Sequence, residues 1–184
     1  MSRQPPSLKV RALQWLAQRE HSPDELRGKL LRLSGRTALA QAQGGPEFDL
    51  ERGDDRASSE REVDALLEWL VAHGYLSSAR FAESRVHARQ QRYGNLRIQQ
   101  ELRRHRVGLD AQTQQALQGS ELDRARQVWQ RKFGAPAEDA AGRARQARFL
   151  AGRGFSSDAI RCVVRGTPSR GGADDNPGEL LEER

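Results

Sequence analysis

Apolar residues that return at helical spacing are the feature that most constrains the fold of this chain. The clearest stripe has apolar residues at i, i+3, i+4, i+7 and i+8, namely Val63, Leu66, Leu67, Leu70 and Val71. Similar stripes recur from near the N-terminus to about residue 165, and no segment alternates polar and apolar residues as a half-buried strand would. The spacing therefore predicts an all-α protein.

The helical stripes also form a weak internal repeat. Leu26 and Leu30 align with Ile98 and Leu102, and a second alignment pairs Leu102 and Val107 with Leu150 and Phe155. About nine helices in three tandem three-helix repeats would account for this pattern, because each repeat buries its apolar face against the next. The sequence predicts an elongated array that can curve.

Breaks in the stripes give the expected domain boundaries. Residues 36–60 hold many Gly, Ser and charged residues and few apolar ones, so we expect a flexible insertion within the first repeat. The expected order is an N-terminal tail at 1–7, repeats at 8–74, 75–118 and 119–166, and a disordered acidic tail at 167–184.

Bulk composition limits the class of protein. Only 36% of residues are hydrophobic and 5% aromatic, which suits thin helical stripes better than a large spherical core. No run approaches the roughly 18 apolar residues of a membrane span, and the start lacks the apolar core of a signal peptide, so we expect a cytoplasmic protein. Cys162 is the single cysteine and is expected to be a buried helical thiol.

The charge is concentrated in the second half of the chain. Residues 80–165 contain 18 Arg and Lys against 8 Asp and Glu, and 28 of the chain's 31 basic residues are Arg. A guanidinium can bind a phosphate or carboxylate with two parallel hydrogen bonds, so a polyanionic or acidic partner is indicated. A GC-rich coding sequence would explain the excess of Arg equally well.

Catalytic and metal-binding constellations are missing from the sequence. The four histidines lie far apart and are expected to be surface or helix-end residues, and there is neither a phosphate-binding Gly-rich loop nor a nucleophile elbow. Trp15, Trp69 and Trp129 are expected to pack in or beside the core rather than to stack on bases. We therefore expect a binding protein that is not an enzyme, with no catalytic residue, cofactor or metal.

Two basic helices carry the candidate binding residues. No acid lies between Asp139 and Asp158, although a solvated helix usually interleaves acids with its bases. These helices predict a surface for nucleic acid or for an acidic protein, and the alternative is a merely solvated face. The candidate residues are Arg97, Arg103, Arg104, Arg143, Arg145, Arg148 and Arg153.

Several motifs in order resemble one known family. Glu68-Trp69-Leu70 leads to the run from Gly74 to Ala82, and the run from Gly94 to Leu102 follows. Together with Lys132-Phe133-Gly134 and the segments 148–150 and 153–155, they resemble the RecX regulatory proteins. The resemblance covers roughly residues 8–166 without the segment 36–60.

The resemblance implies tandem three-helix repeats and a role in DNA repair, recombination and the SOS response. It implies binding to the RecA recombinase filament, contact with single-stranded DNA directly or through that filament, and inhibition of ATPase and strand-exchange activity. We expect a monomer without membrane contact. The alternatives are a freestanding nucleic-acid-binding protein with helix-turn-helix-like modules and a helical scaffold for another acidic protein.

One position departs from the family pattern. Arg106 stands just before Val107, where the family usually has Gly. The left-handed backbone that ends a helix at such a position costs a non-glycine residue about 1 kcal/mol. Gly108 is the alternative residue for this role.

Overall fold

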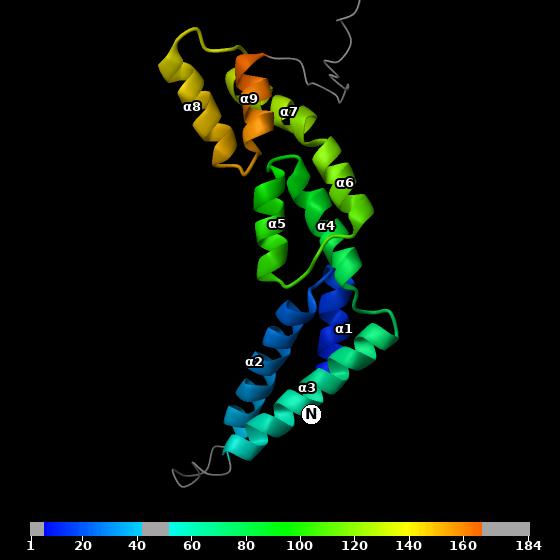
Figure 1. Cartoon of the computed structure of the whole chain (residues 1–184). Coiled ribbons are helices and arrows are strands. Elements are labelled where there is room, and N and C mark those ends of the chain that lie inside the picture. The colour runs from blue at the N-terminus through cyan, green and yellow to red at the C-terminus, as the bar shows by residue number, and fades with distance from the viewer. Residues whose placement is uncertain (1–5, 42–51, 167–184) are drawn as a thin grey trace, which may run out of the picture.

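The computed structural model describes residues 6–41 and 52–166, with side chains at 6–35 and 56–166. Within these residues all regular structure is helical, and the helices follow one another in groups of three (Figure 1). The first unit contains α1 (Leu8–Gln18), α2 (Pro23–Gln41) and α3 (Arg52–Ala72). The second contains α4 (Ser78–Gln90), α5 (Asn95–Arg104) and α6 (Ala111–Gly119), and the third α7 (Glu121–Phe133), α8 (Ala140–Ala151) and α9 (Ser157–Arg165).

Polar caps fix where many of these helices begin. The side chain of the residue before the helix accepts a hydrogen bond from the backbone amide three residues further on, which satisfies an amide that the helix itself leaves unpaired. This geometry is present at Ser7, Ser77, Asp110, Asp139 and Ser156.

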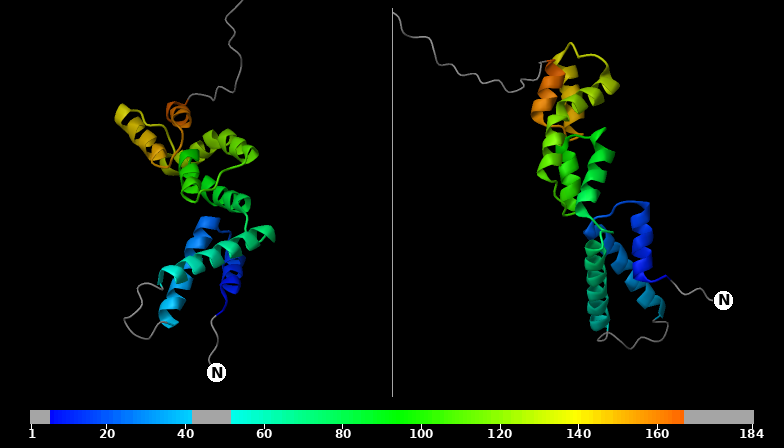
Figure 2. Two further views of the ribbon diagram at one scale, coloured as in Figure 1. Left: turned by 60° about the horizontal axis from the view of Figure 1, so that its bottom comes forward. Right: turned by 90° about the vertical axis from the view of Figure 1, so that its right-hand side faces the viewer.

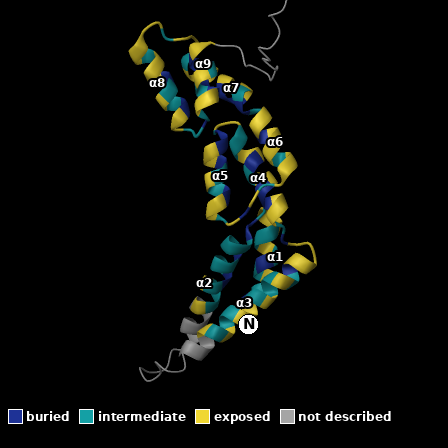
Figure 3. Ribbon diagram, in the orientation of Figure 1, coloured by how far each residue is buried: buried dark blue, intermediate teal, exposed yellow. Residues whose placement is uncertain are grey.

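Each unit has its own apolar cluster, and the units follow one another along the long axis of the molecule (Figure 2). The first cluster contains Leu26, Leu30, Val63 and Leu70, the second Phe81, Ile98, Leu102 and Val107, and the third Trp129, Leu150, Phe155 and Val163. Buried positions therefore lie on the inward faces of the helices in all three units (Figure 3). The predicted all-α array of tandem three-helix repeats is confirmed.

The aligned helices α5 and α8 end in the same turn. The amide of Val107 donates to the carbonyl of Leu102 at 3.1 Å, and the amide of Phe155 donates to that of Leu150 at 3.3 Å. The residue before each amide donor has a positive φ, 53° at Arg106 and 79° at Gly154. Arg106 therefore adopts the left-handed conformation itself, and the idea that Gly108 replaces it is wrong.

The segment 36–60 is more helical than the sequence predicted. Helix α2 continues to Gln41, and α3 already begins at Arg52. The interpretation of the segment as a break was wrong for 36–41, where Ala, Leu and Gln favour a helix even without an apolar stripe. It was also wrong for 52–60, where the two acids Asp54 and Asp55 fall in the first turn of α3, a position that favours acids. An i, i+4 ion pair between Arg56 and Glu60 at 3.3 Å adds support. Residues 42–51 of this segment, and the tail at 167–184, lie outside the described residues.

Some individual residues differ from expectation. Trp129 is buried and Trp15 and Trp69 are half-buried against the first core, so the prediction of core or rim packing is confirmed. His21 lies just before the start of α2, as expected of a helix-end residue, but it is only 1% exposed, and Cys162 is half-buried rather than buried. In the part of the chain that the structure describes, no helix is long and apolar enough to cross a membrane.

Candidate functional site

A buried polar joint connects the second unit to the third. Glu121, the first residue of α7, accepts hydrogen bonds from the amides of Asn95 at 2.9 Å and Ser156 at 3.3 Å. One turn later, Arg124 donates to the side chain of Asn95 and to three backbone carbonyls, those of Gln90, Tyr93 and Leu117. Burial lowers the pKa of the Arg124 guanidinium, and the Glu121 charge offsets part of that effect. The joint thus ties α4, α5, α7 and α9 together.

Backbone contacts fix the same joint from the other side. The amide of Gly94 donates to the carbonyl of Arg153, and the amide of Leu96 donates to that of Gly154, both at 3.0 Å. A Cβ atom at Gly94 would lie 2.3 Å from the Gly154 carbonyl oxygen, so only glycine permits this approach. The start of α5 is therefore held against the turn between α8 and α9.

A basic groove of about 410 Å³ opens beside this joint. We call it the basic groove and define it by Gln91, Arg92, Tyr93, Val128, Arg131, Lys132, Phe149 and Arg153. Four of these residues are cationic, and no Asp or Glu is among the described residues that line it. Among the described residues, the side chains of Arg92 and Lys132 have no hydrogen-bond or ion-pair partner, so their charges are available to an anion.

An arginine side chain lies over each of the two aromatic rings of the basic groove. The guanidinium carbon of Arg97 lies 4.6 Å from the centre of the Tyr93 ring, and that of Arg153 lies 3.8 Å from the centre of the Phe149 ring. Such contacts orient a guanidinium without neutralising it. Arg97 also donates to the carbonyl of Gly152 at 3.2 Å. The structure therefore brings two of the predicted arginines, Arg97 and Arg153, to this one joint.

The other predicted arginines lie apart from the groove. Arg103 and Arg104 are exposed in the last turn of α5, at the opposite end of that helix from Arg97. Arg143 donates to the carbonyls of Ala137 and Glu138, so it supports the loop before α8. Arg145 and Arg148 are exposed on α8 and have no ion pair with any described residue.

The joint between the first and second units has a different charge pattern, because its arginines are paired. Arg80 contacts Glu20 at 2.8 Å and Arg106 contacts Asp24 at 3.2 Å, while Arg85 lies between Glu25 and Glu101. Burial raises the pKa of Glu25, but hydrogen bonds from Arg19 and the charge of His21 outweigh it and lower that pKa to about 2. Free positive charge is therefore concentrated on the second and third units.

Sequence reasoning missed three of the four cations of the basic groove and identified only Arg153. Arg131 and Lys132 lie in the last turn of α7, where cations are common because they complement the helix dipole, so they carried no signal of a site. Arg92 and Tyr93 lie in the short connection between α4 and α5. No sequence pattern shows that this connection and the end of α7 lie side by side. The buried pair Glu121 and Arg124 also resembles ordinary surface residues when read in sequence.

Comparison with known proteins agrees with this architecture. The family model for the second three-helix domain of RecX matches residues 79–114, and the model for the third matches residues 120–164. A protein of Ralstonia nicotianae named Regulatory protein RecX is 42% identical over 179 residues, which is 96% of this chain and 98% of the relative. Proteins of the same name from Herminiimonas arsenicoxydans and Pseudomonas entomophila are 44% and 36% identical, over 86% and 88% of this chain and 91% and 92% of their own lengths. This chain therefore belongs to the RecX family of regulatory proteins.

Proposed function

We propose that this protein binds the RecA recombinase filament on DNA and inhibits its ATPase and strand-exchange activities. The observation that carries the proposal is the basic groove, where four cations converge at a rigid joint and no described lining residue is acidic. An anionic surface can approach this groove without first displacing an ion pair between Arg92 or Lys132 and any residue that the structure describes. The family membership supports a regulatory role.

The proposed mechanism is non-covalent. Phosphates of the DNA or carboxylates of the recombinase would bind the cations of the groove and Arg97 beside it on α5, while the exposed Arg145 and Arg148 on α8 would add contacts outside the groove. A row of three units reaches further than a compact domain of the same mass, so one molecule can contact more than one subunit of a filament. Holding neighbouring subunits in one state would slow the turnover of each. We expect a cytoplasmic monomer to do this.

The test measures ATP hydrolysis by the cognate recombinase on single-stranded DNA. The variant Arg92→Glu/Lys132→Glu reverses two unpaired charges of the groove and should need at least about tenfold more protein for half-inhibition, because removal of each ionic interaction weakens binding by roughly 1 kcal/mol. The matched control is Arg56→Glu/Arg61→Glu, which makes the same net change on exposed positions of α3. Both should keep the helical circular-dichroism signal of the parent.

Equal inhibition by the parent and the groove variant would contradict the proposal. Inhibition should also occur at less than one molecule per recombinase, because each molecule bridges several subunits. Tight binding to one duplex sequence in the absence of recombinase, with no effect on ATPase activity, would instead favour the freestanding nucleic-acid-binding protein.

A further inference from the structure

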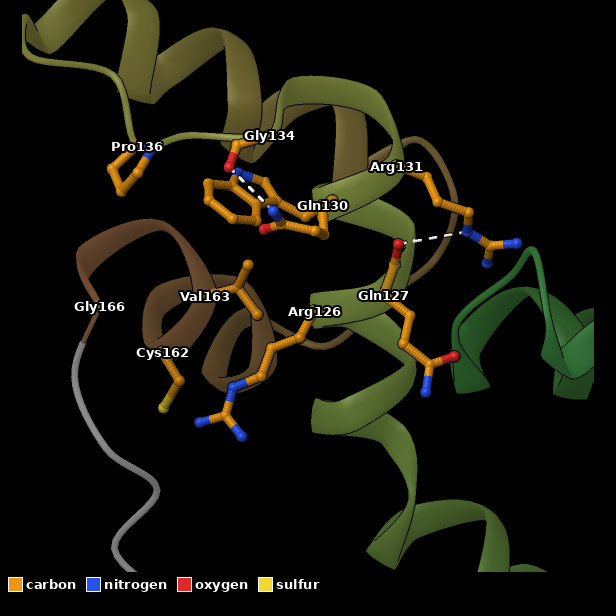
Figure 4. Close-up of a pocket in the computed structure, with 10 residues that line it drawn as sticks. Arg126, Gln127, Gln130, Arg131, Gly134, Pro136, Cys162, Val163 and Gly166 are labelled. Atoms are coloured by element: carbon orange, nitrogen blue, oxygen red, sulfur yellow. Dashed lines mark hydrogen bonds between the residues drawn. The ribbon is translucent and has the colours of Figure 1, made fainter.

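The third unit contains a second groove, which opens between α7 and α9 away from the basic groove. Its volume is about 840 Å³. We call it the α7–α9 groove and define it by Arg126, Gln127, Trp129, Gln130, Arg131, Gly134, Pro136, Cys162, Val163 and Gly166. In Figure 4, Val163 and Cys162 project from α9, and the Arg126 side chain extends from α7 toward the side of α9 that carries Cys162.

The chemistry of this groove suits an acidic segment with apolar side chains. Trp129, Pro136 and Val163 give it apolar walls, while Arg126 and Arg131 are its charged residues and no described lining residue is acidic. Arg126 contacts Asp123 at 3.2 Å, but both side chains are largely exposed, so this pair is weak and easily exchanged. Arg131 points away from α9 in Figure 4 and also lines the basic groove.

The chain itself supplies a segment of this kind. Gly166 lines the groove, and 18 further residues, 167–184, follow it in the sequence. These residues include five acids and two arginines, and their only large apolar residues are Leu180 and Leu181, which Glu179 and Glu182 flank. The fourteen positions from Gly166 to Leu180 can span up to about 45 Å when extended. The segment is therefore long enough to reach any part of the α7–α9 groove, because it follows Gly166, which lines that groove.

We propose that residues 179–183 bind in the α7–α9 groove of their own chain. Leu180 and Leu181 pack against the apolar walls formed by Trp129 and Val163, and the flanking glutamates lie near Arg126. Burial of the two leucines drives the contact, and opposite charge orients it. The bound acids add negative charge beside α7, whose Arg131 and Lys132 also line the basic groove, so they weaken the attraction of that groove for a phosphate or carboxylate. This last consequence rests on the proposed function, whereas the docking itself does not.

Cys162 provides a direct reporter of docking. It is the single cysteine of the chain, it lines the α7–α9 groove and it is half-buried. The experiment compares the rate at which iodoacetamide alkylates Cys162 in the full chain and in the variant Leu180→Asp/Leu181→Asp. The matched control is Gly171→Asp/Gly172→Asp, which adds the same two charges to the segment but keeps both leucines.

The leucine variant should react about tenfold faster than the parent, because a tethered segment at an effective concentration near 1 mM protects its site about tenfold if the intrinsic dissociation constant is about 0.1 mM. The control should react like the parent. The parent rate should stay constant over about a hundredfold range of protein concentration, since the contact is intramolecular.

Equal rates in the parent and the leucine variant would overturn the proposal. Protection that grows with protein concentration would assign the groove to a second copy of the chain, and protection that appears only when recombinase is added would assign it to that partner. Equal rates or concentration-dependent protection would reject the docking without touching the proposed function, because those two measurements use neither DNA nor recombinase. Protection that requires recombinase would reject the docking while supporting recombinase binding.

Discussion

Arg124 on α7 donates a hydrogen bond from Nη2 to Oδ1 of Asn95, the first residue of α5, at 2.5 Å, and both residues are buried. The same guanidinium satisfies three backbone carbonyls and lies near the Glu121 carboxylate. The joint between the second and third units therefore depends on one buried cation. Its removal leaves several buried acceptors without a donor and takes away the positive charge near the Glu121 carboxylate.

We expect Arg124→Met to lower the free energy of unfolding by roughly 3 kcal/mol or more, because the carbonyls would stay buried without their donor and the Glu121 charge would lose the positive charge near it. Urea denaturation followed by circular dichroism measures this change. The matched control is Arg126→Met, two residues along the same helix, where the side chain is exposed and its one ion pair among the described residues is with exposed Asp123. That control should change stability by less than about 0.5 kcal/mol. Similar effects of the two substitutions would show that the joint contributes little.

Gly94→Ala tests the backbone contact of the same joint. The added Cβ would lie 2.3 Å from the carbonyl oxygen of Gly154, so the α8–α9 turn must move and the free energy of unfolding should fall by about 1–3 kcal/mol. Gly108→Ala is the control, because no atom lies within 4 Å of a Cβ there and the backbone has no positive φ. An equal loss of stability in both variants would show that the close approach is not maintained in solution.

Arg106→Gly should make the protein more stable by about 1 kcal/mol. Glycine relieves the positive φ of 53° at this position. The substitution also removes the ion pair between Arg106 and Asp24, but the Arg106 side chain is 83% exposed, so that effect is small. Thermal denaturation compares this variant with Arg106→Lys, which keeps both the charge and the strained backbone and should match the parent. A lower melting temperature for Arg106→Gly would refute the strain argument.

These residues show how far sequence reasoning extends in this chain. The aligned stripes containing Leu26, Ile98 and Leu150 are local, so they predicted the helices, the cores and the threefold repeat. The family pattern marked position 106 as one that usually has Gly, but the alternative that Gly108 takes this role was wrong, because Arg106 itself adopts the positive φ. The basic groove could not be predicted from the sequence. Arg92 and Lys132 line the same groove only because the joint brings α4, α5 and α7 together, and the buried polar residues of that joint have no distinctive spacing.

Two titratable groups near the joint between the first and second units, His21 and Glu25, make the free energy of unfolding depend on pH. Arg19, His21, Lys29 and Arg85 surround the Glu25 carboxylate. Burial, followed by the charge of Arg19, lowers the pKa of His21 from 6.5, although Glu25 opposes this shift. Hydrogen bonds from Arg19 and the charge of His21 lower the pKa of Glu25 to about 2, against the effect of burial.

Both shifts predict loss of stability in acid. An unfolded chain binds a proton at His21 more readily than the folded one, so stability should fall as the pH drops below 6.5. The Glu25 contribution is complete above pH 4.5 and should be lost as the pH falls from there toward 2. Urea denaturation between pH 7.5 and about pH 3 measures both steps.

The variants Glu25→Gln and His21→Gln separate the two groups. Glu25→Gln should lower the free energy of unfolding at pH 7 by about 2 kcal/mol, after allowance for solvent screening, and should flatten the curve below pH 4.5. His21→Gln should flatten the curve only in the region just below pH 6.5. A curve of the same shape in the parent and both variants would exclude these residues as its cause.

Arg143 and Arg145 lie on the same helix, two residues apart, and the structure gives them different roles. Arg143 supports the carbonyls of Ala137 and Glu138, whereas Arg145 is exposed with no ion pair among the described residues. Arg143→Glu should therefore lower the free energy of unfolding by about 1 kcal/mol, because those carbonyls lose a charged donor. Arg145→Glu should leave stability unchanged.

The affinity for DNA should show the reverse: Arg145→Glu should change it more than Arg143→Glu does. If Arg145 contacts a phosphate of single-stranded DNA or of the filament, Arg145→Glu should weaken binding and reduce the slope of log affinity against log salt by about 0.7 for each phosphate that is no longer neutralised. Arg143→Glu should leave that slope close to the parent value, because its guanidinium is already engaged with the loop. Fluorescence anisotropy of labelled single-stranded DNA over a salt series measures the slopes, and addition of recombinase extends the comparison to the filament. A parent-like slope for Arg145→Glu would remove the middle of α8 from the binding surface and confine that surface to the basic groove.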